Sequence, residues 1–166
     1  MLLRIAFATL LLVLALSAED SAWPRKKCRA LILEGGGDHG AYEAGAMWGF
    51  VETMDANEVA WDYIDGISAG GINAAYAFTS EKGTEKIMVE DLIALWRSFS
   101  RKDVYTTWKG GILYSVIAEP SIFNNEPLRK FLKKQLEGRK IQRPFGIGTF
   151  NFNTGDYVVF DETTVT

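Results

Sequence analysis

The residues best suited to chemistry lie around Ser68, which has a glycine two positions before it, Gly66, and another two positions after it, Gly70. Residues 61–67 have the composition of a strand and residues 72–79 that of a helix, so the turn between them has the form of a nucleophile elbow. In such a turn the serine backbone is strained and the hydroxyl projects from the end of the sheet. Side chains at the two glycine positions would collide with the neighbouring strand or helix. The pattern favours a serine nucleophile, although the pentapeptide alone fits an ordinary strand-to-helix turn equally well.

A second glycine cluster precedes the serine turn and allows two interpretations. In the first, Gly35, Gly37 and Gly40 follow an apolar strand and precede a helix, as in the dinucleotide-binding fingerprint. That interpretation also needs an acidic residue at the end of the second strand, about 20 residues beyond the loop. Asp65 lies roughly where this ribose-binding carboxylate would sit. Nicotinamide binding is therefore one open hypothesis.

In the second interpretation the same glycines form an oxyanion hole. Because glycines carry no side chains, the backbone N–H groups of this loop are free to turn toward a substrate carbonyl. The loop contains Gly35, Gly36, Gly37 and Gly40. Each donor placed where negative charge develops contributes about 2.7–4 kcal/mol to transition-state stabilisation. Because loops that follow successive parallel strands share the carboxyl end of a sheet, we expect this loop to lie beside Ser68.

The single histidine and the single cysteine limit the other chemistries of the chain. A Ser–His–Asp triad would have to use His39, which precedes the serine and lies inside the glycine loop, a poor position for a base. A carboxylate bonded directly to the serine hydroxyl would make a histidine dispensable. Cys28 has no second cysteine with which to form a disulfide, and no glycine-rich turn or helix start surrounds it to activate the thiol.

The elements that must position these residues alternate in type along the chain. Apolar runs, apolar residues at helical spacing and turn residues predict strands at 29–34, 61–67, 144–151 and 157–160, and helices at 41–54, 72–79, 84–99 and 125–138. The last two strands form a hairpin around the turn 153–156. Residues 103–123 are predicted to be irregular, the kind of segment that often forms a binding loop or lid. This order of elements predicts an α/β layered fold.

The composition fits one globular domain with a sizeable core. The chain has 166 residues, of which 48% are hydrophobic and 23% charged, and its formal net charge is -3. This slightly acidic balance gives no support for a nucleic-acid partner, which would need a basic surface.

The first residues have the character of a secretory signal. Arg4 supplies the basic start, an apolar run follows, and residues 15–17 offer small side chains for cleavage, so we predict a signal peptide at 1–17. The apolar run is shorter than the ~20 residues that a membrane-spanning helix needs. A secreted or lumenal protein is the favoured interpretation, and an uncleaved anchor or a buried first helix is the alternative.

Taken together, these motifs resemble the patatin-like phospholipases. The matching residues come in the same order over about 29–160, and the two glycine motifs are the more specific part of the match. They are Glu34-Gly35-Gly36-Gly37-Asp38-His39-Gly40-Ala41, Gly66-Ile67-Ser68-Ala69-Gly70, Ser121-Ile122-Phe123 with Pro127-Leu128-Arg129-Lys130, and Asn153-Thr154-Gly155.

The resemblance implies a lipid acyl hydrolase that works through a Ser–Asp dyad, without a metal, a cofactor or a histidine base. Ser68 would be the nucleophile, and Gly36 and Gly37 would donate to the oxyanion. The substrate would be a phospholipid or another acyl lipid, met at a membrane or lipid surface by a peripherally associated protein. The implied fold is a three-layer α/β sheet with helices on both faces, of which residues 29–166 would be the N-terminal part.

The irregular segment would then have a role in binding the lipid. Its bulky side chains would cover the acyl chain, or would pack as core beneath a loop, and the two alternatives are equally favoured. These side chains are Trp108, Ile112, Leu113, Tyr114 and Ile117.

Two features depart from the family pattern. The family usually has Arg or Lys at the position of His39. The family's dyad aspartate lies in an Asp-Gly-Gly or Asp-Gly-Ala motif well after the Asn-Thr-Gly turn, and no such motif follows Gly155. We therefore expect these 166 residues to be a fragment that ends before the base, with little or no ester turnover by itself.

Three classes of function are therefore compatible with the sequence. The first is the serine hydrolase, the second is a non-catalytic lipid-binding or partner-binding module, and the third is a dinucleotide-binding domain. Loss of ester turnover in Ser68→Ala favours the first, lipid binding without turnover the second, and retention on a nicotinamide cofactor the third.

Overall fold

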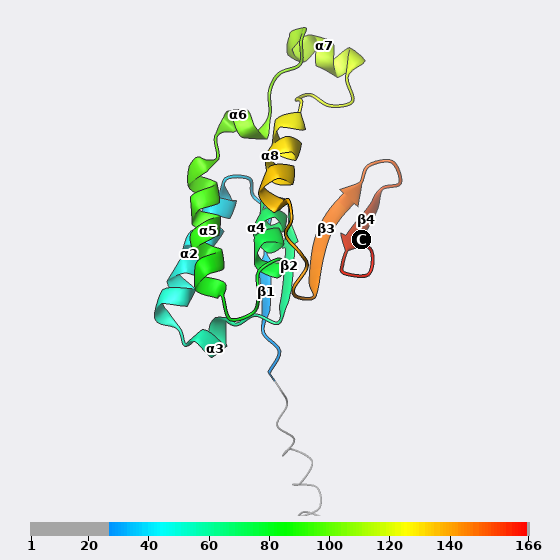
Figure 1. Ribbon diagram of the computed structural model, residues 1–166. Coiled ribbons are helices and arrows are strands. Elements are labelled where there is room, and N and C mark those ends of the chain that lie inside the picture. The colour runs from blue at the N-terminus through cyan, green and yellow to red at the C-terminus, as the bar shows by residue number, and fades with distance from the viewer. Residues whose placement is uncertain (1–26, 166) are drawn as a thin grey trace, which may run out of the picture.

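The predicted strands and helices are all present, and three short helices, α3, α6 and α7, are added between them (Figure 1). The computed structural model describes residues 27–165, so the predicted signal peptide at 1–17 lies outside the described residues. The elements are β1 (Ala30–Leu33), α2 (His39–Thr53), α3 (Ala56–Val59), β2 (Tyr63–Ile67), α4 (Ala69–Phe78), α5 (Glu85–Ser98), α6 (Arg101–Val104), α7 (Gly111–Ala118), α8 (Glu126–Leu136), β3 (Phe145–Asn151) and β4 (Asp156–Phe160).

The strands form one mixed sheet in the order β1-β2-β3-β4. The first three strands are parallel, with Leu31 opposite Ile64 and Ile64 opposite Phe145, and β4 returns antiparallel to β3 as the predicted hairpin. Gly155, in the turn of that hairpin, has φ 78°, a conformation that glycine adopts without strain. The α/β fold is confirmed, and its parallel strands place the loops after β1 and β2 at the same end of the sheet.

Helices α2, α4 and α5 cover one face of β1 and β2. On that face Leu31, Leu33 and Ile64 are buried, whereas Ile32, which points the other way, is 66% exposed. This alternation is the pattern of a strand with one buried face. On the other face of the sheet, the Ile32 side chain of β1 is left open to solvent within the described residues.

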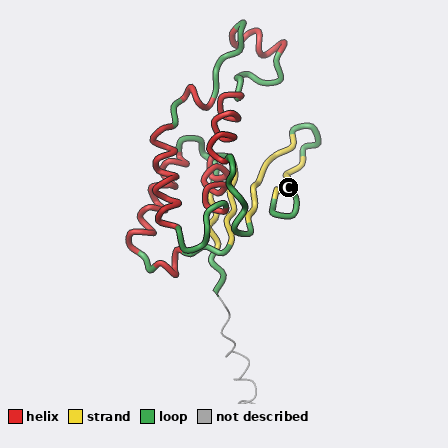
Figure 2. Tube along the Cα trace, in the orientation of Figure 1, coloured by secondary structure: helices red, strands yellow, loops and turns green. Residues whose placement is uncertain are grey.

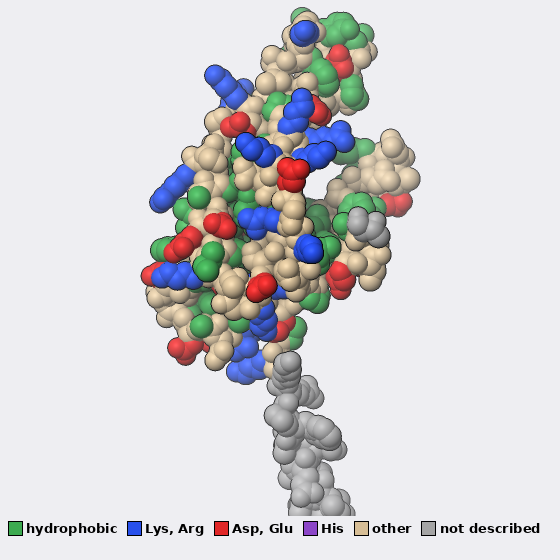
Figure 3. All heavy atoms as spheres, in the orientation of Figure 1, with side chains coloured by type: hydrophobic (Ala, Val, Ile, Leu, Met, Phe, Trp, Pro, Cys, Tyr) green, Lys and Arg blue, Asp and Glu red, His purple; other side chains and the backbone are tan. Residues whose placement is uncertain are grey.

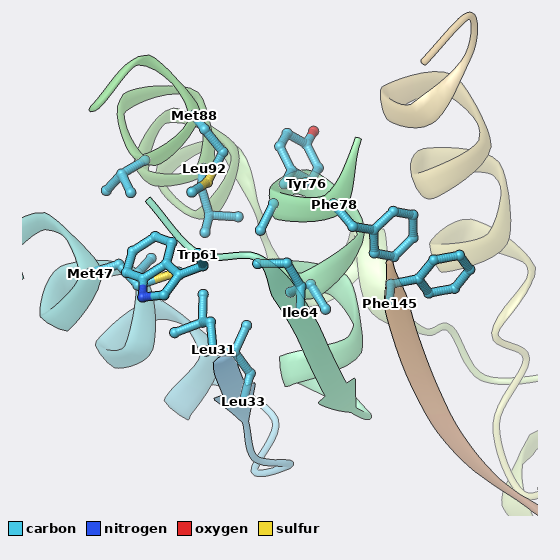
Figure 4. Packing of buried hydrophobic residues seen from close by; sticks show 14 of the residues in the cluster. Leu31, Leu33, Met47, Trp61, Ile64, Tyr76, Phe78, Met88, Leu92 and Phe145 are labelled. Atoms are coloured by element: carbon cyan, nitrogen blue, oxygen red, sulfur yellow. The ribbon is translucent and has the colours of Figure 1, made fainter. Parts of the chain in front are cut away.

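The core lies between this sheet face and the helices, as Figure 4 shows. Apolar residues at helical spacing, Met47 of α2 and Met88 and Leu92 of α5, meet Ile64 from the central strand in one buried cluster. At its edge, the Phe78 ring at the end of α4 stacks on Phe145 of β3, with 3.9 Å between centroids. Burial of each such side chain stabilises the fold by about 1.5–3 kcal/mol, so this cluster is what holds the sheet against α4.

The prediction that residues 103–123 are irregular is wrong in part, because this segment contains α7. Figure 2 shows α7 carried on two loop segments away from the rest of the helices. Gly110 precedes the helix with φ 113°, and Pro120 follows its end. Eight residues between a glycine pair and a proline leave too little periodicity to predict a helix from sequence.

A buried ion pair stabilises the end of the domain at which β3 begins, opposite the glycine loop. Arg143, just before β3, donates through Nη1 to Oε1 of Glu85 at 2.8 Å, and the two side chains are only 2% and 4% exposed. The same guanidinium also donates to the carbonyl oxygens of Trp61, Ser80 and Glu81. All of these contacts join α5 and the loops at this end to the start of β3.

We predict that Arg143→Ala lowers the free energy of unfolding by about 3–5 kcal/mol, because it leaves the Glu85 carboxylate buried without a partner. Urea denaturation followed by circular dichroism measures the change. The matched control is Glu52→Gln, which breaks the exposed pair between Glu52 and Lys86 and should shift the midpoint far less, because exposed ion pairs contribute little. Equal effects of the two substitutions would show that the Arg143 pair does not stabilise the domain.

Candidate functional site

Ser68 occupies a strained turn between β2 and α4. Its φ is 55° and its ψ is -121°, and it is the only non-glycine residue with positive φ among residues 27–165. This conformation matches the first central position of a type II′ turn, which glycine favours, and it costs a serine about 1–3 kcal/mol. The side chain is exposed, and its hydroxyl makes no hydrogen bond within the described part of the chain.

The flanking glycines are required by close contacts between backbone segments. A Cβ atom added at Gly66 would lie 2.3 Å from the carbonyl oxygen of Gly70, and one added at Gly70 would lie 2.4 Å from the carbonyl oxygen of Glu34. The Gly70 N–H donates to that same Glu34 oxygen at 3.0 Å. The elbow is therefore pressed against the end of β1, and neither position has room for a side chain.

The predicted neighbour of the elbow, the glycine loop, lies directly beside it. A Cβ atom at Gly35 would come within 3.2 Å of the Ser68 Cβ atom, and Gly37 lines the same pocket as Ser68. Gly36 and Gly37 have φ 153° and 62°, so both adopt conformations that side chains disfavour. Gly40, already in α2, packs where a Cβ atom would lie 2.4 Å from the Trp96 ring. The structure thus brings together all the predicted glycines and the serine.

A buried amide ties the glycine loop to the elbow helix. Asn73 of α4 is completely buried, and its Nδ2 donates to the carbonyl oxygen of Gly40 and to Oε2 of Glu43, each at 2.9 Å. Its Oδ1 accepts from Nε1 of Trp96 at 2.8 Å. Oε1 of Glu43 in turn accepts the Glu34 N–H at 2.8 Å. Both ends of the loop are therefore held by one connected set of hydrogen bonds.

Sequence reasoning missed Asn73, Glu43 and Trp96 as residues that position the site. The only signal for Asn73 is that it is a polar side chain among small apolar residues in a helix that follows an elbow. Trp96 belongs to the apolar residues at helical spacing that predicted the helix at 84–99, and its side chain does pack against the core. The hydrogen-bond partners lie 23 to 33 residues apart, so no local pattern reveals them.

A pocket of about 770 Å³ opens at Ser68. Its volume is within the ~300–1,000 Å³ range of ligand sites. Ser68 and Gly37 lie at one side, and the remaining wall is largely apolar. Most of its apolar residues come from α4, α6 and α8 and from the positions that follow α5 and α6, and they include Ile72, Phe99, Val104, Tyr105, Leu128 and Leu132. The pocket thus offers an apolar chain a space that starts at the serine.

Besides Ser68, the polar residues of the pocket wall include Asp38 beside the glycine loop and Ser100 and Arg101 at the start of α6. Asp103 does not line the pocket, but it holds Ser100 in place. Ser100 and Asp103 form a capping box in which the Ser100 N–H donates to Asp103 Oδ2 at 2.9 Å and the Ser100 hydroxyl donates to the same oxygen at 2.5 Å. These two hydrogen bonds lower the pKa of the Asp103 carboxyl. Arg101 also lines the pocket and places its guanidinium 5.2 Å from the centre of the Tyr105 ring.

The bulky residues predicted to cover an acyl chain lie elsewhere. Ile112, Leu113, Tyr114 and Ile117 are exposed on α7 and are absent from the pocket wall, so both the predicted cover and the alternative of core packing are wrong. They miss the pocket because α7 projects from the domain instead of folding back over it (Figure 1). Trp108 is partly buried and donates through Nε1 to the carbonyl oxygen of Ser121.

His39 and Asp65, considered from the sequence as a base and as a ribose-binding carboxylate, are not in contact with Ser68. His39 is exposed at the start of α2, and its ring lies against Gly36, where a Cβ atom would be 3.0 Å from Nδ1. Asp65 accepts a hydrogen bond from the Tyr63 hydroxyl at 3.0 Å. Its carboxylate lies over Gly146 of the neighbouring strand, where an added Cβ atom would be 2.4 Å from Oδ2. The Asp65 carboxylate therefore lies on the face opposite α4 and is not offered to the glycine loop.

Within the described range, no group of three or more His, Cys, Asp or Glu residues is arranged to hold a metal ion. None of the helices between residues 27 and 165 combines the length and apolarity needed to cross a bilayer.

Comparison with known proteins identifies one family. Residues 31–163 match the family model described as patatin-like phospholipase. The match includes the glycine loop, the elbow and all the strands except the first residue of β1. No curated protein matches the chain.

We predict that Gly66→Ala lowers the free energy of unfolding by at least about 1–3 kcal/mol, because the added methyl group would overlap a backbone oxygen that cannot move away. Thermal and urea denaturation measure the change. The matched control is Gly45→Ala in α2, where an added Cβ atom meets nothing within 4 Å. That substitution should stabilise the helix by about 0.5–1 kcal/mol. A neutral Gly66→Ala would contradict the close contact at the elbow.

We also predict that Ser68→Gly raises the free energy of unfolding by about 1 kcal/mol, because glycine adopts positive φ without the steric cost that the serine Cβ atom incurs. Ser68→Ala keeps the Cβ atom and should give no such gain. The two variants are compared with the wild-type protein by urea denaturation. If both change stability alike, the turn at Ser68 is not strained.

Proposed function

Because the chain belongs to the patatin-like phospholipase family, we propose that it acts as a serine-dependent lipid acyl hydrolase with Ser68 as its nucleophile. The hydroxyl oxygen attacks the acyl carbonyl carbon, the alcohol part of the lipid leaves, and water then releases the fatty acid from acyl-Ser68. The proposal rests above all on one observation, a strained serine beside a glycine loop at the opening of an apolar pocket.

The glycine loop would stabilise the negative charge that develops on the carbonyl oxygen. Backbone N–H groups of Gly36 and Gly37, with that of Ala69 after the nucleophile, are the proposed donors. Gly35 and Gly40 would keep the loop close to the elbow, because a side chain at either position would push a neighbouring residue away. Asn73 and Glu43 would fix the same loop from the helix side.

The base that activates Ser68 is proposed to be an aspartate carboxylate, as in the Ser–Asp dyad of the family. Such a carboxylate would accept the hydroxyl proton and later return it to the leaving alcohol. Within residues 27–165 no carboxylate is hydrogen-bonded to the Ser68 hydroxyl, and Asp103 is engaged by Ser100 at the start of α6. His39 is not proposed as the base, because its ring lies against Gly36 instead of Ser68.

The pocket supports a phospholipid or another acyl lipid as the substrate. An acyl chain would lie against Ile72, Leu128 and Leu132, and Arg101 offers a cation to a phosphate at the wall. The signal-like residues 1–17 and the acidic composition support a secreted or lumenal protein that does not bind nucleic acid.

A second candidate function is a non-catalytic module that binds acyl lipids in this pocket. It is favoured by the lack of any hydrogen bond to the Ser68 hydroxyl in the described residues. A module would use the pocket and the glycine loop to hold an acyl ester or a fatty acid without cleaving it. The reactivity of Ser68 distinguishes the two functions.

We predict that an alkyl fluorophosphonate modifies Ser68 selectively. Its phosphoryl oxygen resembles the oxyanion of acyl transfer, so the N–H donors of the loop should favour attack by Ser68 even where turnover is slow. The reaction is carried out at mildly alkaline pH, and the modified serine is identified by mass spectrometry of peptides. Ser100 and Ser121 are exposed serines in the same protein and serve as internal controls.

Modification of Ser68 well above that of Ser100 and Ser121, abolished in Ser68→Ala, is the expected result. Gly37→Ala, which should disturb the loop at its φ of 62°, is expected to slow modification by about tenfold or more, as the loss of an oxyanion donor does. Uniform modification of the exposed serines would favour the lipid-binding module, and ester turnover that persists in Ser68→Ala would contradict the proposed nucleophile.

A further inference from the structure

Helix α7 presents an apolar surface that the fold does not use. Leu113 and Ile117 are 85% and 88% exposed, Val116 is also exposed, and only Ser115 is buried. Scattered apolar side chains are common on protein surfaces, but a contiguous cluster usually marks a site of interaction. Here the cluster is formed by one short helix at the far end of a projection (Figure 1).

The projection has a defined stem. Thr106 and Asn124 exchange backbone hydrogen bonds of 3.0 and 2.9 Å across its two segments. The rings of Tyr105 and Phe123 pack with their centroids 4.8 Å apart. Tyr105 also lines the pocket at Ser68, so the stem connects α7 directly to the pocket wall and places both at the same end of the molecule.

The region around α7 is basic although the whole chain is acidic. Residues 101–140 contain nine Lys or Arg and four Asp or Glu, whereas residues 27–100 contain five and twelve. Arg129, Lys130, Lys133 and Lys134 are exposed together along one face of α8. Figure 3 shows Lys and Arg side chains gathered on the viewed face over α8 and α6, below α7.

We propose that α7 is a membrane-docking element, which inserts its apolar side chains among the lipids of an anionic membrane while the cations of α8 face the lipid phosphates. An apolar cluster next to cations is the combination that binds such interfaces, since burial of apolar area and attraction to anionic head groups act together. A protein groove would match the apolar cluster but gives no reason for the adjacent cations. This inference deepens the proposed function, on which it rests, because docking would bring the pocket at Ser68 to the lipid.

Docking is tested with a fluorophore whose emission reports polarity, in the full chain with Cys28→Ser and Ser68→Ala. Cys28 is the only cysteine, and Ser68→Ala prevents hydrolysis from altering the vesicles. The fluorophore is attached in Leu113→Cys and, as the matched control, in Ile87→Cys, an apolar position of α5 that is 62% exposed outside the basic region. The vesicles consist of phosphatidylcholine with phosphatidylglycerol, or of phosphatidylcholine alone.

With the anionic vesicles, the emission of the Leu113→Cys conjugate should shift to the blue, the shift should weaken with added salt, and the Ile87→Cys conjugate should not respond. In flotation assays, Leu113→Ser combined with Ile117→Ser should lower the partition coefficient by about tenfold or more. Lys133→Gln combined with Lys134→Gln should lower it by about tenfold, while Ile87→Ser should leave it unchanged.

Three outcomes would overturn the proposal. They are an unresponsive Leu113→Cys conjugate, equal binding to neutral and anionic vesicles, and a blue shift that rises with protein concentration in the absence of lipid, which would indicate a second copy as the occupant. Hydrolase chemistry is scored separately, by fluorophosphonate modification of Ser68 in solution. Docking without modification would refute only the hydrolase, and modification without docking would refute only the membrane role of α7.

Discussion

The contact between the first turn of α4 and the end of β1 is the constraint on which the site depends. The Gly70 N–H bonds to the Glu34 carbonyl oxygen at 3.0 Å, and the next turn of the helix sends the Asn73 amide to Gly40 and Glu43. The glycine loop begins after Glu34 and ends at Gly40, and α4 makes hydrogen bonds to both of these residues. The loop and the serine are therefore positioned by one helix, and a shift of either would break buried hydrogen bonds that have no water to replace them.

Such a constraint explains how a serine persists at positive φ. A strained backbone conformation survives only where the surrounding structure determines it more strongly than local preference does. At Ser68 the surroundings are β2, packed through Ile64 into the core, and α4, packed through Ala74 and Ala77 against the sheet. At the opposite end of the sheet, the Arg143–Glu85 pair holds α5 to the start of β3. Packing throughout the domain therefore compensates for the energetic cost of the Ser68 conformation.

The sequence predicts the elbow and the sheet because both are encoded locally. Glycines at fixed spacing from Ser68 and apolar runs in the strands are visible within a few residues, and parallel strands then bring the two loops together. The network of Asn73 is invisible because its partners are distant in sequence, and Asp65 was placed near the glycine loop because a strand pattern does not say which face a carboxylate takes. Helix α7 was missed because a helix of eight residues has little periodicity, and its position away from the pocket depends on the stem at Thr106 and Asn124.

The direction of the sheet determines where the functional features gather. The carboxyl ends of β1 and β2 carry the glycine loop and Ser68, and the pocket they open is completed by α6 and α8. An isolated helix as short as α7 is not stable in water by its sequence alone, and its apolar side chains gain nothing from the core. The paired stem that retains α7 at this end, beside the basic face of α8, is therefore better explained by contact with something outside the chain than by the stability of the fold. The sheet thus orients the serine, the pocket and the exposed helix toward the same side of the molecule.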